Sequence, residues 1–185
     1  YKELLLSRKY YYSNFKSNSK IALRNQNKKI KIGYISADFR NHPVSLLLAR
    51  VIELHDKSKF EIYAYSLLRD EDDMTLRLKK AFDKFIYIGD LIDSEAVNLI
   101  RKDNINIAID LMGYTKNARA NLFAKRVAPN QISFLGYPGT TGGEAIDYLI
   151  ADKYVIPKDF SKFYSENILY MPYTCLLYTS DAADE

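Results

Sequence analysis

The densest group of residues suited to ligand binding is a glycine-rich stretch, Leu135-Gly136-Tyr137-Pro138-Gly139-Thr140-Thr141-Gly142-Gly143. Four of the seven glycines in the chain fall within eight residues here. Glycine permits positive φ angles and a close approach of ligand to backbone, and the hydroxyls of Thr140 and Thr141 add hydrogen-bond donors. A tight structural turn uses the same residue types, so composition alone leaves a ligand site and a turn equally open.

Two further side chains are suited to proton chemistry. His42, one of only two histidines, lies in a polar segment that ends in Pro43. A neutral imidazole there can accept the proton of an incoming hydroxyl or donate a hydrogen bond to a phosphate. Asp110 ends an apolar stretch and is either a ligand-facing carboxylate or a loop cap. His55, at the end of a predicted helix, is expected to face solvent.

These residues are placed by an alternation of apolar stretches rich in β-branched residues with amphipathic stretches. Strands are predicted at residues 30–36, 60–66, 85–88, 105–111, 131–135 and 148–152, and helices at 44–55, 74–82, 93–102 and 119–126. The alternation predicts an α/β fold, a doubly wound, mainly parallel, Rossmann-like sheet with helices on both faces.

Ligands of such sheets bind outside the carboxyl ends of the strands. The loops 38–43, 110–115 and 136–143 are therefore the candidate site. Neither Gly-x-Gly-x-x-Gly nor a Walker pattern occurs in the sequence, which disfavours a nucleotide held by the usual glycine turn after the first strand.

Length and composition indicate one globular domain, since 48% of the 185 residues are hydrophobic and 27% are charged. The net charge of +4 comes from the leading segment, because residues 1–31 hold nine Lys or Arg against one Glu. We interpret residues 1–28 as a connector without a nucleic-acid partner, although a basic segment with tyrosines is also compatible with nucleic-acid contact.

The sequence contains no apolar run of membrane-helix length, and the single Cys175 excludes an internal disulfide and a multi-cysteine zinc site. We expect a cytoplasmic protein that holds no metal.

Several motifs resemble, in order and spacing, the protein O-linked N-acetylglucosamine transferases and their SPINDLY-type relatives. They are Asp38-Phe39-Arg40-Asn41-His42-Pro43-Val44, Asp110-Leu111-Met112-Gly113-Tyr114-Thr115, Arg119 with Phe123-Ala124, Ala128-Pro129, the glycine-rich stretch, and Tyr164-Ser165-Glu166. The likeness covers residues 29–174.

The resemblance implies the amino-terminal lobe of a two-lobed GT-B glycosyltransferase that moves N-acetylglucosamine from UDP-GlcNAc to Ser or Thr of acceptor proteins. In this family the lobe follows tetratricopeptide repeats, and the donor is the only small molecule required. His42 matches the active-site histidine of the family's Asn-His-Pro motif, as base or as organiser, and Asp110 is a second catalytic candidate. The resemblance also implies substrate contacts from the surrounding loops, at Asn41, Tyr114, Thr115, Pro138, Gly139, Thr140 and Thr141.

Residues 175–185 do not continue the family pattern and resemble a translated sequencing adapter, so we interpret them as non-native. We expect the chain alone to be inactive, because the resemblance covers only one of two lobes. Two alternatives remain open: a related transferase that uses fucose or glucose, and a non-catalytic α/β interaction module whose basic leader contacts an acidic partner.

Overall fold

A computed structural model describes residues 29–173. The predicted connector 1–28 and the predicted non-native tail 175–185 lie outside the described residues. The described strands are β1 (Ile30–Ser36), β2 (Phe60–Ser66), β3 (Lys84–Tyr87), β4 (Ile107–Asp110), β5 (Asn130–Phe134), β6 (Tyr148–Ala151) and β7 (Asn167–Tyr170). The helices are α2 (Pro43–Glu53), α3 (Asp73–Ala81), α4 (Asp93–Lys102), α5 (Ala120–Ala124) and the 3-10 helix η1 (Lys158–Phe163).

The described strands form one sheet in the order β3-β2-β1-β4-β5-β6-β7, and every neighbouring pair is parallel. The chain winds from β1 outward to β3, returns to β4 beside β1, and then winds in the other direction. This order contains the topological switch point of Rossmann-type sheets, between β1 and β4. In the register of these two strands, Ile35 lies beside Asp110. The predicted doubly wound fold is confirmed.

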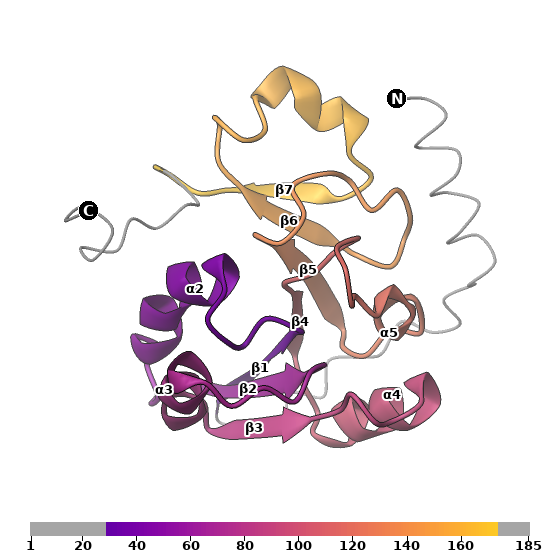
Figure 1. The fold of residues 1–185 in the computed structure, drawn as a ribbon. Coiled ribbons are helices and arrows are strands. Elements are labelled where there is room, and N and C mark those ends of the chain that lie inside the picture. Colours follow the sequence, from indigo (N-terminus) through magenta and orange to yellow (C-terminus); the bar gives the residue numbers. More distant parts are fainter. Residues whose placement is uncertain (1–28, 174–185) are drawn as a thin grey trace.

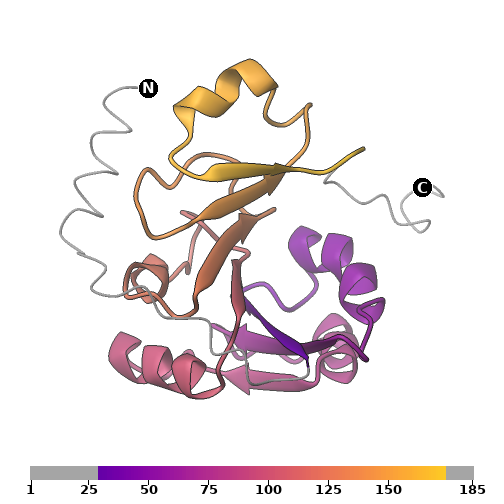
Figure 2. The same ribbon diagram turned by 180° about the vertical axis from the view of Figure 1, so that it is seen from behind.

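The helices pack on both faces of the sheet, and an apolar core lies between the helices and each face. On one face, Leu48 of α2 and Leu78 of α3 belong to the core that includes Ile62 of β2. On the other face, Val97 of α4 and Leu122 of α5 belong to the core that includes the β2 and β4 side chains facing that way. Figures 1 and 2 show α2 and α3 on one side of the sheet and α4 and α5 on the other. The loops at the carboxyl ends of the strands are thus held by elements packed on both faces.

The predicted strands 30–36 and 60–66 agree with the structure to the residue. The strand predicted at 105–111 is shorter, Ile107–Asp110. It begins two residues later than predicted. At Asn106 the side chain, and not a backbone carbonyl, accepts the N–H of Lys31 in the neighbouring strand, at 2.8 Å. η1 and β7 were not predicted, since β7 is a four-residue edge strand with alternating exposed and half-buried positions.

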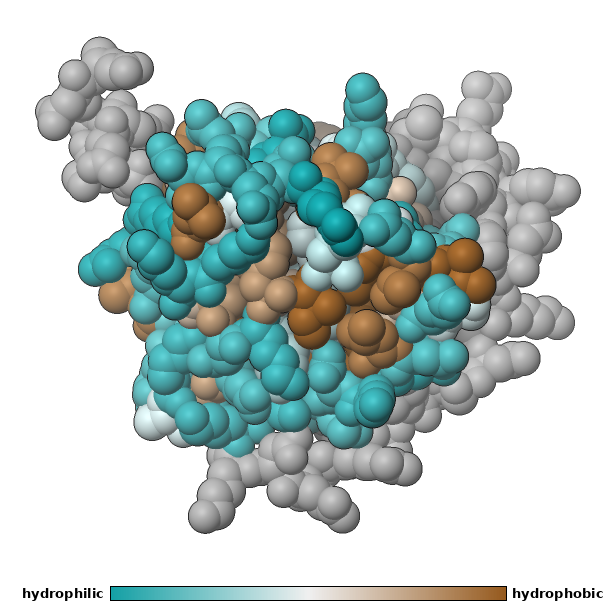
Figure 3. All heavy atoms as spheres, turned by 60° about the horizontal axis from the view of Figure 1, so that its bottom comes forward, coloured by the Kyte–Doolittle hydropathy of each residue, from teal (hydrophilic) through white to brown (hydrophobic). Residues whose placement is uncertain are grey.

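Seen from the β3 end of the sheet, most of the coloured surface is hydrophilic, with apolar side chains gathered towards the middle (Figure 3). Most of the large apolar side chains that are exposed in the described part of the chain lie around η1 and β7. They are Tyr154, Val155, Phe160, Phe163, Leu169, Met171 and Tyr173. The β7 end of the sheet is therefore its most apolar exposed region.

Candidate active site

The loops after β1 and β4 meet at the switch point and carry His42 and Asp110. A thioether connects them, because the Met112 sulfur accepts the backbone N–H of Ala37 at 3.3 Å and the Ser36 hydroxyl at 3.4 Å. Met112 is 2% exposed. A methionine in a sequence indicates only an apolar side chain, which does not predict this role of Met112. The structure makes it the bridge between the two loops.

His42 is the N-cap residue of α2. Its Nδ1 accepts the N–H of Val44 at 3.3 Å, and Pro43 occupies the first turn of the helix. The Asp38 carboxylate lies 3.7 Å from the same Nδ1. Nε2 has no hydrogen-bond partner among residues 29–173, and about one third of the side chain is exposed. When Nδ1 accepts from Val44, Nε2 carries the proton of the neutral ring; when Nδ1–H turns to Asp38, Nε2 is free to accept one.

The loop before His42 is fixed by the start of α3. Asp72 accepts the backbone N–H of Asn41 at 2.5 Å and that of Thr75 at 2.8 Å. These hydrogen bonds, that of Asn41 foremost, lower the pKa of the Asp72 carboxyl. Thr75 Oγ1 donates to the carbonyl of Phe39 at 2.8 Å. Asn41 is exposed, so its backbone holds the loop while its side chain stays available to a ligand.

Asp110 is the last residue of β4, the neighbour of β1. It therefore lies at the same edge of the sheet as the His42 loop, which follows β1. It is 5% exposed, and burial raises the pKa of its carboxyl to about 6. One oxygen accepts the N–H of Met112 at 2.9 Å and the other accepts that of Gly113 at 3.1 Å. These bonds oppose the effect of burial. In this structure the carboxylate holds the turn that follows β4.

Tyr114 and Thr115 continue that turn. The Tyr114 hydroxyl donates to the carbonyl of Thr141 at 2.7 Å, and its ring meets that of Tyr137 edge-on at 5.5 Å. Thr115 is exposed, and its hydroxyl donates to the carbonyl of Met112 at 2.9 Å. The loop after β4 is therefore in direct contact with the loop after β5, as expected for two candidate-site loops.

Close packing of the two loops explains two glycines at this contact. A Cβ on Gly136 would lie 1.9 Å from the carbonyl oxygen of Leu111, and one on Gly113 would lie 2.4 Å from Tyr137 Cβ. Leu135, just before, has a φ of 64°, and the N–H of Gly136 donates to the carbonyl of Phe134 at 2.9 Å. These two observations describe a γ-turn with positive φ, a strained arrangement that ends β5 abruptly.

The tip of the glycine-rich loop holds the remaining candidates. Pro138 is exposed, and its carbonyl accepts the hydroxyl of Tyr164 at 2.9 Å. Gly139 lies against the ring of Tyr137, where a Cβ would come within 2.8 Å. The N–H groups of Gly139 and Gly143 have no hydrogen-bond partner among the described residues. These backbone groups are the loop's available donors.

The two threonine hydroxyls point into the protein. Thr140 Oγ1 donates to Glu166 at 2.7 Å and accepts the N–H groups of Gly142 and Ser165, both at 3.1 Å. A hydroxyl has one proton and two lone pairs, so that of Thr140 is fully used. The Thr141 hydroxyl also donates to Glu166. A contact of either residue with substrate in this conformation would come from its backbone. Sequence spacing does not predict these contacts of Glu166, because its partners Thr141 and Thr140 lie 25 and 26 residues away.

The expectation for His55 is wrong. Its Nδ1 lies 2.7 Å from the carbonyl of Val51, and its Nε2 lies 3.1 Å from the hydroxyl of Tyr34. Its ring also meets the rings of Tyr34 and Phe60 edge-on. His55 is half-buried because it closes the end of α2 over the sheet, so its role is structural.

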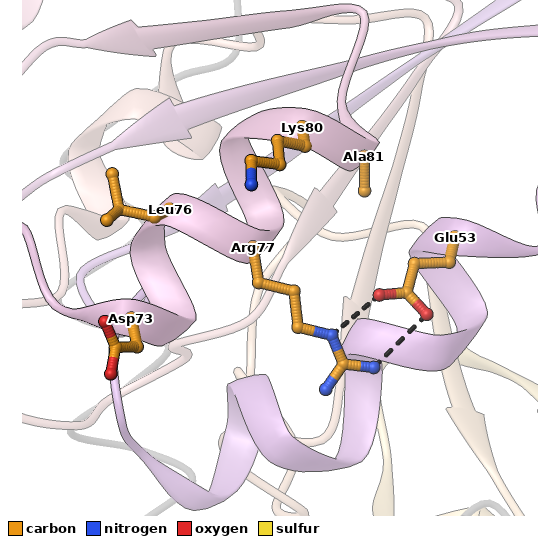
Figure 4. Close-up of a pocket in the computed structure, with 6 residues that line it drawn as sticks. All are labelled: Glu53, Asp73, Leu76, Arg77, Lys80 and Ala81. Carbon is orange, nitrogen blue, oxygen red and sulfur yellow. Dashed lines mark hydrogen bonds and ion pairs between the residues drawn. The ribbon is translucent and has the colours of Figure 1, made fainter.

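A shallow hollow lies elsewhere, between α2 and α3 (Figure 4). It is lined by Glu53, Asp73, Leu76, Arg77, Lys80 and Ala81. Arg77 spans it and forms two hydrogen bonds with Glu53, at 2.7 and 3.2 Å. None of the predicted site residues lines this hollow.

Within residues 29–173, no helix is long and apolar enough to cross a membrane. In the same range, His, Cys, Asp and Glu side chains form no group of three or more arranged to hold a metal ion.

Comparison with known proteins gives a family. The model described as glycosyl transferase family 41 matches residues 4–182. The chain is 37% identical over 147 residues to the probable UDP-N-acetylglucosamine--peptide N-acetylglucosaminyltransferase SEC of Arabidopsis thaliana, which is 79% of this chain and 15% of that protein. It is 35% identical over 169 residues to the corresponding probable SPINDLY enzyme of Oryza sativa, which is 88% of this chain and 18% of that protein.

A solved structure agrees with these relatives. A mutant of the Thermobaculum terrenum O-GlcNAc transferase superimposes with a TM-score of 0.87 at 30% identity, over 93% of this chain and 34% of that chain. The chain thus spans less than a fifth of the length of the two plant relatives and about a third of the solved structure. Because the family model covers nearly all of its residues, the chain belongs to glycosyl transferase family 41.

Proposed function

We propose that this chain is the amino-terminal lobe of a GT-B enzyme that transfers N-acetylglucosamine from UDP-GlcNAc to Ser or Thr hydroxyls of proteins. The observation that carries the proposal is the position of His42 at the switch point between β1 and β4, with Nε2 unpaired among the described residues. The names of the relatives, which include a UDP-N-acetylglucosamine--peptide N-acetylglucosaminyltransferase of Caenorhabditis elegans, support the choice of sugar and acceptor.

The chemistry requires a proton acceptor and a group that stabilises the leaving diphosphate. A bond forms between the acceptor oxygen and the anomeric carbon, the bond to the diphosphate oxygen breaks, and the hydroxyl proton must leave. In the tautomer with Nδ1–H turned to Asp38, His42 can take that proton or orient the hydroxyl that loses it. The unpaired N–H groups of Gly139 and Gly143 can stabilise negative charge.

The remaining site residues fit supporting roles in this proposal. Asn41 and Thr115 present exposed side chains at the same edge, and Tyr114 and Pro138 shape the loop between them. Asp110, with a pKa of about 6, exchanges its proton near neutral pH and would act on the charge of the site rather than on the acceptor directly. No step in this scheme calls for a metal.

The domain organisation is proposed on the same basis. Residues 29–174 form the lobe, residues 1–28 connect it to preceding tetratricopeptide repeats, and residues 175–185 are non-native. The family model matches residues 4–182 and so runs across both proposed boundaries without marking them. The boundaries at residues 28 and 174 are proposed from the sequence. The exposed apolar side chains around β7 support a further unit packed near that end of the sheet. We also propose a cytoplasmic location.

A donor comparison tests the function. The full-length protein would be incubated with Ser- and Thr-containing peptides and with UDP-GlcNAc, UDP-glucose or GDP-fucose, and peptide mass would report transfer. Transfer from UDP-GlcNAc alone is expected. Transfer from another donor only would replace the sugar while keeping the reaction class. An inactive protein with all three donors would refute the proposal in favour of a non-catalytic interaction module.

A further inference from the structure

A buried carboxylate that the scheme above does not use lies directly before β7. Glu166 is 5% exposed. None of the ion pairs found among residues 29–173 includes it. It accepts the N–H of Thr141 at 2.6 Å, the hydroxyl of Thr140 at 2.7 Å, the hydroxyl of Ser165 at 3.2 Å and the hydroxyl of Thr141. A buried charge requires such charge-assisted hydrogen bonds in place of water.

Glu166 holds a segment that has no helix or strand of its own. On one side, the glycine-rich loop is held by the loop after β4, through the packing of Gly136 on Leu111 and the hydrogen bond from Tyr114 to Thr141. On the other side, Glu166 and the Tyr164 hydroxyl hold it from the segment before β7. Replacing the carboxylate would leave buried donors of the loop without acceptors, so the loop would have to change conformation to satisfy them.

The same loop carries the unpaired N–H groups of Gly139 and Gly143 on either side of the two threonines. The Gly139 N–H shares its peptide plane with the Pro138 carbonyl, which accepts the Tyr164 hydroxyl, and Gly143 follows Gly142, whose N–H the Thr140 hydroxyl accepts. We propose that Glu166 is a positioning residue for glycosyl transfer: it touches no substrate, and it holds the loop in the conformation that aims these N–H groups at the diphosphate of the sugar nucleotide. This inference rests on the proposed function.

The test compares E166Q with E144Q in the full-length protein. Glu144 lies just after Gly143 at the end of the same loop, is exposed, and has no ion pair or hydrogen bond among the described residues. E166Q is isosteric, but its amide nitrogen cannot accept a hydrogen bond. We expect E166Q to raise KM for UDP-GlcNAc about tenfold or more while kcat at saturation changes less than about threefold. E144Q is expected to match the wild type.

Hydrogen exchange provides the readout that does not depend on turnover. Peptides covering 136–143 should exchange about tenfold faster in E166Q, while peptides from β1 and β4 remain as protected as in the wild type. Equal loss of protection in all of these peptides with unchanged KM would show a merely structural role and overturn the inference. Unchanged exchange and unchanged KM would overturn it as well.

Two outcomes separate this inference from the proposed function. A wild-type protein without transfer activity refutes the function itself, whereas an active wild type with a normal KM in E166Q refutes only the role of Glu166. Should E166Q fail to fold, Y164F removes the hydrogen bond from the Tyr164 hydroxyl to the Pro138 carbonyl, which joins the same two segments. We then expect KM to rise about two- to fivefold, and an unchanged KM in Y164F would refute the inference.

Discussion

Gly136→Ala is the substitution whose effect the structure determines most directly. The added Cβ would lie 1.9 Å from the carbonyl oxygen of Leu111, 2.7 Å from its carbonyl carbon and 3.1 Å from Met112 Cα. All three are backbone atoms in the loop directly after β4, so no side-chain rotation relieves the contact. The two loops must separate by roughly 1 Å or more to restore van der Waals distance. Overpacking of this kind costs about 2–3 kcal/mol of unfolding free energy.

The cost should be visible in thermal unfolding and in activity. For a domain of this size, about 2–3 kcal/mol lowers the melting temperature by roughly 5–10 °C. The displacement also moves the donor groups of the glycine-rich loop away from the His42 loop, so the KM for UDP-GlcNAc should rise about tenfold or more, as in E166Q. Scanning fluorimetry and the transfer assay measure the two effects on the same preparation of the full-length protein.

Gly33→Ala is the matched control. Gly33 lies within β1, where an added Cβ would lie 3.0 Å from the Tyr65 ring and 3.1 Å from Ile105, both side-chain contacts. Alanine in a strand also reduces the entropy of the unfolded chain, so the net change should stay within about 1 kcal/mol. If G136A melted no lower than G33A, the close contact between the loops after β4 and β5 would be wrong.

Three further predictions follow from single side chains. The pKa of Asp110 is raised from 3.8 to about 6, so its protonation stabilises the folded state below pH 4 and this contribution is lost as the pH rises through 6. The unfolding free energy of the wild type relative to D110N should therefore fall by about 2 kcal/mol between pH 4 and 7 in denaturant titrations, and a constant difference would contradict the shifted pKa. Leu135 has a φ of 64°, so L135G should be more stable than L135A by about 1 kcal/mol in the same titrations; the reverse order, usual in strands, would rule out the strained turn. Arg119 binds Asp93 and the carbonyls of Ile88 and Leu91, so R119K should lose about 2 kcal/mol, and an unchanged midpoint would show that these bonds contribute little.

The regular parts of the fold were predictable because their signals are local. The runs at β1 and β2 are rich in β-branched and aromatic residues and are bounded by polar turns, so both strands agree to the residue. The capping carboxylate of Asp72 and the proline at the start of α2 mark helix starts in the same local way. The parallel arrangement followed from the alternation of strands and helices, and it places the three candidate loops at one edge.

The details that were missed depend on contacts between distant residues. The hydrogen bonds of Glu166 to Thr140 and Thr141 connect positions 25 or 26 residues apart, and β7 exists because β6 supplies its only partner among the described strands. His55 was misjudged because its partner Tyr34 lies 21 residues earlier. The inward direction of the two threonine hydroxyls could not be read from a glycine-rich composition that fits both turns and ligand loops.

The most direct test of the central claim separates the two roles of His42, helix cap and proton-handling group. Asn is as good an N-cap as any residue, and its side-chain oxygen can accept the N–H of Val44 in place of Nδ1. H42N in the full-length protein should therefore keep the wild-type melting temperature, whereas H42A should lose about 1 kcal/mol. Both variants should lower kcat for transfer from UDP-GlcNAc by about a hundredfold or more. Near-normal turnover in H42N would show that His42 only caps α2, and the assignment of the active site to the switch point between β1 and β4 would be wrong.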